Sequence, residues 1–243
     1  MNIKLTIQYD GTAYNGWQVQ PNGDTIEARL KAAIRRITGE DVRLRGCGRT
    51  DSGVHALNYV CNFRTDSSVP PERYPYALNT YLPDDIVCLR AEKADEEFDA
   101  NRSAKGKRYI YRIWNSDIPN AFWSRYAWNY KYALDESKMN EAARAFIGEH
   151  DFVGFASSGF TVKTTVRMIY SLDVSREGEL VTIDVCGSGF LYNMVRIIAG
   201  TLAAVGSGKI KASDMENIIE SQKRERAGIT APARGLCLKE VYY

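Results

Sequence analysis

The residues best suited to chemistry lie in one short stretch, Gly48-Arg49-Thr50-Asp51-Ser52-Gly53-Val54-His55-Ala56. Glycine permits tight backbone paths and the close approach of a second molecule, so this stretch is predicted to be a loop that presents Asp51 to a ligand. Arg49 lies two residues earlier and favours the ionised form of the acid. An ionised, desolvated carboxylate can act as a nucleophile or as a general base. Because Asp-Ser-Gly is also a common surface turn, Asp51 alone does not define a site.

Arg196 is the one charged residue between Gly187 and Gly208, inside an otherwise apolar helical pattern. A buried arginine needs an anion, and Asp51 is the candidate for that anion. The alternative is that the arginine extends past its neighbours to water. Asn193 precedes it by three residues and therefore shares its helix face. The two predict a polar stripe that faces either solvent or a site.

Tyr109 and Tyr111 alternate with basic residues along a predicted strand. Aromatic rings among basic side chains can stack on unpaired bases while the charges hold phosphates. Aromatic residues on strands are also common in cores, which leaves both interpretations open. The net charge is only +2, but positive charge gathers in residues 29–49 and 101–132. Basic patches of this kind favour a polyanionic partner over a neutral one.

Other kinds of site find less support. Asp51, Ser52 and His55 could form a hydrolase site, but they are crowded together and no Gly-x-Ser-x-Gly motif is present. Two histidines and five scattered cysteines without a Cys-x-x-Cys pair argue against a metal site and favour reduced thiols in a cytoplasmic protein. The longest apolar run, residues 190–205, is interrupted by polar residues and is too short to span a bilayer. We therefore expect no metal and no membrane segment.

Strands and helices alternate irregularly along the chain, which predicts an α+β fold with helices packed on a mostly antiparallel sheet. One helix is expected to begin at Asp24, with Glu27 as its capping-box partner, and to end at Gly39. The acidic run near residue 95 gives way to a basic one, so we expect two similar subdomains, residues 1–103 and 104–243. The predicted strands are 3–9, 42–45, 59–63, 86–93, 107–114, 171–175, 180–186 and 235–243, and the predicted helices are 24–39, 73–81, 134–147, 191–205 and 212–222.

Seven segments in order resemble the tRNA pseudouridine synthase A family, over essentially the whole chain. Any one of them would be weak evidence, and their shared order makes the resemblance specific. They are Tyr9-Asp10-Gly11-Thr12 with Gly16-Trp17-Gln18, Gly48–Ala56, Lys107-x-Tyr109-x-Tyr111-Arg112, Gly148–Phe152, Lys163–Arg167, Phe190–Arg196 and Thr230–Leu236.

The resemblance implies the isomerisation of uridine to pseudouridine at positions 38 to 40 of the tRNA anticodon stem-loop. It also implies the pseudouridine synthase fold, with helices on one side of the sheet and a cleft between two similar subdomains. No cofactor and no metal are implied. The expected assembly is a homodimer that binds the anticodon arm of tRNA across both subunits.

The resemblance also assigns roles to residues. Asp51 matches the catalytic aspartate, which either attacks the nucleoside covalently or removes a sugar proton. Tyr109 matches the tyrosine that stacks on the base, and Arg196 matches the arginine that pairs with the aspartate. Arg49 matches the residue that holds the target nucleotide out of the stack. Further RNA contacts are expected from Arg102, Lys107 and Arg112.

Two positions depart from the family pattern. Tyr59 stands where a glutamine is usual, and Asn101 stands where an arginine is usual, with Arg102 next to it as a substitute. Both put RNA contacts in question. The competing class is a tRNA-binding protein without activity, but binding alone does not require the combination of Asp51, Tyr109 and Arg196.

Overall fold

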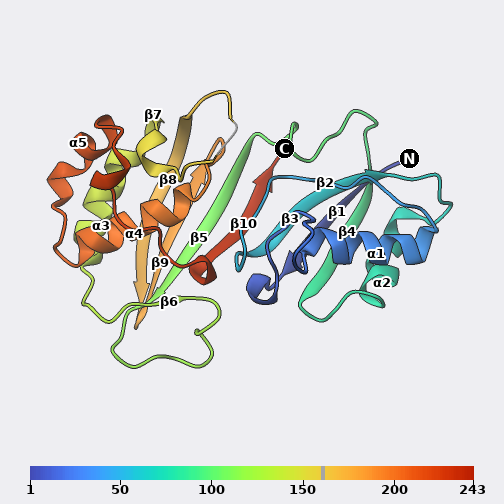
Figure 1. Ribbon diagram of the computed structural model, residues 1–243, viewed down its shortest axis with the longest axis horizontal. Helices are drawn as coiled ribbons and strands as arrows, with labels where there is room; N and C mark the ends of the chain where they lie inside the picture. The colour runs from blue at the N-terminus through green and yellow to red at the C-terminus, as the bar shows by residue number, and fades with distance from the viewer. Residues whose placement is uncertain (160–161) are drawn as a thin grey trace. The chain divides into compact units, whose positions relative to one another are not determined.

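The computed structural model describes residues 1–159 and 162–243, which form two compact units (Figure 1). The first unit comprises Met1–Lys105 together with Cys237–Tyr243, and the second comprises Gly106–Leu236. The sequence pattern predicts a single boundary between residues 103 and 104, with every later residue in the second subdomain. The structure differs at Cys237–Tyr243, because this segment pairs with a strand of the first unit.

The first unit is built on strands β1 (Asn2–Tyr9), β2 (Arg45–Gly46), β3 (His55–Arg64), β4 (Ile86–Ala94) and β10 (Leu236–Tyr242). Their order is β4-β1-β3-β10, and β2 pairs with β3. β1 runs antiparallel to both β3 and β4, whereas β10 runs parallel to β3 through Cys237 opposite His55 and Leu238 opposite Ala56. The alternating residues Ile3, Leu5 and Ile7 are fully buried, as the sequence pattern predicts.

Helices α1 (Ile26–Thr38) and α2 (Tyr74–Asn79) contact each other, and α2 also lies against β4 (Figure 1). The 3-10 turns η1 (Gly11–Ala13) and η2 (Pro71–Arg73) complete the described elements of this unit. The predicted start of α1 is wrong by one residue, since Thr25 is the N-cap and its side chain accepts a hydrogen bond from the Ala28 amide. Asp24 pairs with Arg29 instead, and Glu27 accepts from the Val19 amide. Gly39 ends the helix as predicted.

The second unit carries β5 (Gly106–Trp114), β6 (Trp128–Asn129), β7 (Gly148–Asp151), β8 (Val166–Glu177) and β9 (Leu180–Gly187). Their order is β5-β9-β8-β7, with antiparallel pairing throughout that path and β6 parallel to β5. The helices are α3 (Glu136–Ala143), α4 (Met194–Gly206) and α5 (Met215–Glu220), with 3-10 turns η3 (Arg144–Phe146), η4 (Val153–Phe155), η5 (Ala212–Asp214), η6 (Arg224–Arg226) and η7 (Ala233–Gly235).

The core of the second unit centres on α4, most of which is buried. α3 contacts α4 and β8, and α4 contacts β5, so that helices pack on the sheet (Figure 1). The predicted helices 134–147 and 212–222 are each divided into an α-helix and a 3-10 turn. These elements confirm the α+β class with mostly antiparallel sheet. Within the described part of the chain, no helix is both long and apolar enough to cross a membrane.

Candidate active site

Asp51 lies in the segment between β2 and β3, residues 47–54, which we call the Asp51 loop. Backbone contacts hold this loop from both ends. The Cys47 amide donates to the Val60 carbonyl at 2.9 Å, and the Val54 amide donates to the Asp51 carbonyl at 3.1 Å. The second contact closes a turn with Asp51 at its first position, so the carboxylate projects from a defined bend. The Asp51 residue is half-buried.

A second segment, residues 9–17, seats the Asp51 loop. The Trp17 amide donates to the Thr50 carbonyl at 3.0 Å, and the Ser52 hydroxyl donates to the Tyr14 carbonyl at 3.1 Å. Gly16 adopts a φ of +85°, and a Cβ at this position would press on the backbone of Thr50 and Asp51. The segment around Trp17 and the Asp51 loop are therefore held together by hydrogen bonds and by close packing of their backbones.

Two tyrosine hydroxyls contact the residues on the N-terminal side of Asp51. The Tyr9 hydroxyl is 2.9 Å from the Thr50 hydroxyl, and the Tyr59 hydroxyl donates to the Gly48 carbonyl at 2.6 Å. The Tyr59 ring is fully buried and stacks on Trp17, with ring centres 4.1 Å apart. Burial raises the pKa of Tyr59, so its hydroxyl keeps its proton and remains a donor.

Arg49 and His55 flank Asp51 in different environments. Arg49 is exposed, whereas His55 begins β3 and is only 5% exposed. The His55 Nδ1 atom lies 3.0 Å from the Gly11 amide and 3.1 Å from a carboxylate oxygen of Asp10. An unprotonated Nδ1 accepts from the amide, and a protonated Nδ1 donates to the acid; one nitrogen does not do both. Either contact ties His55 to the segment of residues 9–17 that seats the Asp51 loop.

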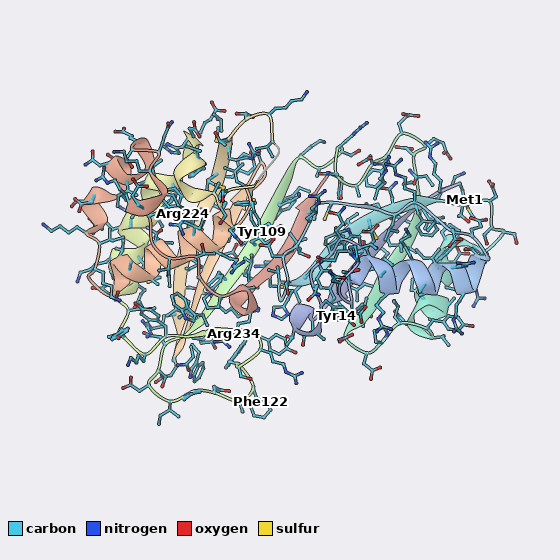
Figure 2. The ribbon with its side chains drawn as sticks, in the orientation of Figure 1. Met1, Tyr14, Tyr109, Phe122, Arg224 and Arg234 are labelled. Carbon is cyan, nitrogen blue, oxygen red and sulfur yellow. The ribbon has the colours of Figure 1, made fainter. Side chains whose placement is uncertain are left out.

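In the second unit, Tyr109 lies on β5 opposite Val185 of β9. Its ring meets Phe190 edge to face, with centres 5.2 Å apart and planes at 86°. Figure 2 labels Tyr109 among the side chains of β5. Tyr111 on the same strand is fully buried and donates to the Pro232 carbonyl at 2.8 Å. Tyr111 is therefore core, while Tyr109 is half-buried.

Arg196 is anchored within the second unit by two hydrogen bonds. Its Nε donates to the Ala231 carbonyl and its Nη1 donates to the Asn193 side-chain oxygen, both at 2.7 Å. Asn193 and Arg196 contact each other directly, but Asn193 is the N-cap of α4 with a φ of 61° and not a helical residue, so the contact does not arise from a shared helix face. That the pair faces a site stays a prediction. Asn193 in turn donates to the Ser157 hydroxyl at 2.9 Å.

Burial raises the pKa of Tyr111, and the positive charges of Arg196 and Arg234 oppose that shift. Both arginines therefore lie close enough to Tyr111 for their charges to act on it. Arg234 was not singled out from the sequence. The available signal was that Arg234 is the one charged residue in the segment Thr230–Leu236.

The expected RNA-binding residues differ in what they touch. The Arg112 guanidinium lies 5.7 Å from the centre of the Trp123 ring, and Lys107 is half-buried on β5. Arg102 is exposed on a turn whose amides at 101 and 102 are both held by the Asp99 carboxylate. Arg108, by contrast, forms a forked ion pair with Asp184 at 2.6 and 2.9 Å.

The candidate residues are divided between the two units. Asp51 and Arg49 belong to the first, and Tyr109 and Arg196 belong to the second. The pairing of Asp51 with Arg196 stays a prediction. Among residues 1–159 and 162–243, no group of three or more His, Cys, Asp or Glu is placed to hold a metal ion.

Comparison with known proteins gives matches along the whole chain. A family model described as tRNA pseudouridine synthase matches residues 5–101 and 142–243. The tRNA pseudouridine synthase A of Acetivibrio thermocellus is 52% identical over 100% of this chain and 99% of its own length. The enzyme of the same name from Ruminiclostridium cellulolyticum is 48% identical over 99% of both chains. Among solved structures, a Cbf5-Nop10-Gar1 complex aligns with 97% of this chain and 57% of the matched chain, at 14% identity and a TM-score of 0.39.

The relatives matched by sequence define a class, the enzymes that make pseudouridine in tRNA. The chain belongs to the tRNA pseudouridine synthase family, since the family model covers most of it and close relatives match from end to end.

Proposed function

We propose that this protein isomerises uridine to pseudouridine in the anticodon stem-loop of tRNA, at positions 38 to 40. The observation that carries the proposal is the end-to-end match to tRNA pseudouridine synthases, together with an Asp51 loop held on several sides. In this reaction the bond from the ribose to the uracil nitrogen breaks, and a bond from the ribose to carbon 5 forms. A proton leaves carbon 5 and the freed ring nitrogen takes one up, so the net reaction is an isomerisation that needs no oxidant and no added group.

Asp51 is the proposed catalytic carboxylate. It acts either as a nucleophile on the nucleoside or as a base toward a sugar proton. Tyr109 is the proposed stacking partner of the uracil, and its edge-to-face contact with Phe190 fixes the plane of its ring. Arg196 is the proposed partner of Asp51, and its bonds to Ala231 and Asn193 orient the guanidinium. Exposed Arg49 is suited to hold a flipped nucleotide.

Arg102, Lys107 and Arg112 are proposed to contact the tRNA backbone. Exposure of Arg102 and the position of Lys107 and Arg112 on β5 support this assignment. The same family membership supports a homodimer, a cytoplasmic location and a reaction without cofactor. Exposed apolar side chains on the loop after β5, Ile118 at 77% and Phe122 at 88%, support a contact between subunits.

The test is tritium release from tRNA that carries 5-tritiated uracil, with the wild type and Asp51→Asn measured side by side. Formation of the carbon–carbon bond must expel that tritium. We expect release by the wild type and none by Asp51→Asn, while the tRNA affinity of the variant stays within about threefold of wild type because a carboxylate facing phosphates adds little to binding. Equal loss of affinity and of turnover would contradict the catalytic role of Asp51.

The same assay separates the competing classes. His55→Ala serves as the hydrolase test, because a hydrolase built on Asp51 and His55 would lose all activity, whereas a synthase retains turnover once the variant is folded. Absence of release by the wild type, from several tRNAs that do bind, would favour a binding protein without activity.

A further inference from the structure

Two of the three residues before Asp51 are held by contacts from outside the loop. Thr50 is buried, its carbonyl accepts from Trp17, and its hydroxyl meets Tyr9. Gly48, two positions before Thr50, has no side chain that could form such a contact. The hydrogen bond that fixes its peptide comes from the Tyr59 hydroxyl, which donates to the Gly48 carbonyl at 2.6 Å.

Tyr59 is itself held rigidly. Its backbone pairs with Ile7 across the β1–β3 ladder, and its ring lies between Trp17 at 4.1 Å and Tyr9 at 5.7 Å. The ring is fully buried, so Tyr59 is not itself an RNA contact. Gly46 leaves the space that the hydroxyl needs, since a Cβ there would collide with the Tyr59 hydroxyl and with the Trp17 ring.

We propose that Tyr59 is a positioning residue for the reaction, because its hydroxyl fixes the Gly48 carbonyl and thereby the direction in which the loop presents Asp51. The inference rests on the proposed function of Asp51. It also gives a physical role to the tyrosine that stands where the family usually has glutamine. At this position the side chain acts through the protein backbone rather than on the RNA.

The expected effect is on the chemical step. A reacting group displaced by about 1 Å can cost about a hundredfold in rate. Tyr59→Phe keeps the ring and its stacking on Trp17 and removes only the donor. We expect kcat for tritium release to fall about 10- to 100-fold, with KM for tRNA unchanged within about threefold.

Tyr243→Phe is the matched control. Tyr243 belongs to the same unit, and its hydroxyl also donates to a backbone carbonyl, that of Ala100 at 2.8 Å. Both variants lose one hydroxyl-to-carbonyl hydrogen bond, so an effect on kcat that comes only from lower stability should appear in both. A kcat for Tyr59→Phe no lower than that of Tyr243→Phe would overturn the inference, as would a rise in KM with kcat unchanged.

Amide hydrogen exchange supplies a readout that does not depend on turnover. In Tyr59→Phe we expect faster exchange at residues 49–54 and unchanged exchange in β1. Gly46→Ala, which crowds the hydroxyl without removing it, should show the same local change. Unchanged loop exchange in both variants would overturn the inference even if turnover fell. If the wild type released no tritium, the proposed function would fail, and the catalytic part of this inference would fail with it. Faster loop exchange in Tyr59→Phe would still establish that the Tyr59 hydroxyl supports the Asp51 loop.

Discussion

At the scale of single residues, Arg196 shows how one guanidinium can be oriented before any substrate arrives. Two of its nitrogens donate in different directions, to a backbone carbonyl and to the Asn193 side chain. Lysine has a single ammonium group on a flexible stem and does not reproduce this fork. The orientation of the charge therefore depends on arginine, not merely on a positive side chain.

We predict that Arg196→Lys lowers the free energy of unfolding by about 1–3 kcal/mol, because at least one buried acceptor loses its donor. Turnover should fall by more than the loss of folded protein explains. Thermal unfolding and tritium release measure the two effects separately.

Arg176→Lys is the control for this prediction. Arg176 donates to Glu136, Asn115 and the Leu134 carbonyl within the same unit, so its replacement should cost similar stability. No role in the reaction is proposed for it, and its turnover per folded molecule should stay at the wild-type level. Equal loss of turnover in both variants would contradict a specific role for Arg196.

Residue-scale prediction from sequence succeeded where one helix or one short loop decides the outcome. The contact of Asn193 with Arg196 is present at 2.7 Å, although Asn193 makes it as the N-cap that precedes α4 and not as a residue within the helix. The cap of α1 was predicted one residue too early, because Asp24 and Thr25 are both good caps and Arg29 competes for the acid. The hydrogen bond of Tyr59 to Gly48 was beyond prediction, since it requires the pairing register of β2 and β3.

At the scale of elements, the Asp51 loop owes its shape to the segment that precedes α1. Gly16 lies in that segment with φ at +85°, and its missing side chain faces the carbonyl of Thr50 and the backbone of Asp51. The approach of the two backbones is possible only because this residue is glycine.

We predict that Gly16→Ala abolishes most turnover, because a methyl group there must displace the Asp51 loop. Gly39→Ala is the control, since Gly39 has a similar φ of +78° at the end of α1 but no atom within 4 Å of an added Cβ. Gly39→Ala should lose about 1 kcal/mol of stability from strain alone and keep its turnover. Steady-state tritium release with thermal unfolding checks both, and full activity in folded Gly16→Ala would refute the argument.

The order of elements could be predicted from sequence, because each strand or helix carries its own periodicity. β1, β4 and β5 agree with the predicted spans to within one or two residues. The partners of each strand could not be predicted from these local patterns. The placement of β10 beside β3 depends on contacts between residues far apart in sequence.

At the scale of the whole molecule, the loop between β5 and β6 presents apolar side chains to solvent in a fixed shape. The Trp114 ring nitrogen donates to the Ile118 carbonyl at 3.0 Å, and the Asn120 side chain holds the amides of Phe122 and Trp123. Figure 2 shows Phe122 on this loop. Ordered, exposed apolar side chains of this kind are typical of interaction surfaces.

We predict that the double replacement Ile118→Ser with Phe122→Ser shifts the proposed homodimer toward monomer. Light scattering coupled to size-exclusion chromatography measures the mass over a range of concentrations. Tyr76→Ser is the control, because Tyr76 is an equally exposed aromatic residue on α2 of the other unit. If the dimer persisted in the double variant but dissociated in Tyr76→Ser, the contact between subunits would lie at α2 and not at the loop between β5 and β6.

The parallel pairing of Cys237 and Leu238 with His55 and Ala56 has a consequence for the order of synthesis. On the ribosome, β3 and the loop before it emerge early, and the strand that lies beside them emerges only after Gly106–Leu236 have been made. Until then, the start of β3 at His55 and Ala56 lacks the strand that pairs with it, while the second unit is translated and begins to fold. A truncated chain that stops before Cys237 would therefore carry all of Gly48–Ala56 without the strand that pairs with His55 and Ala56.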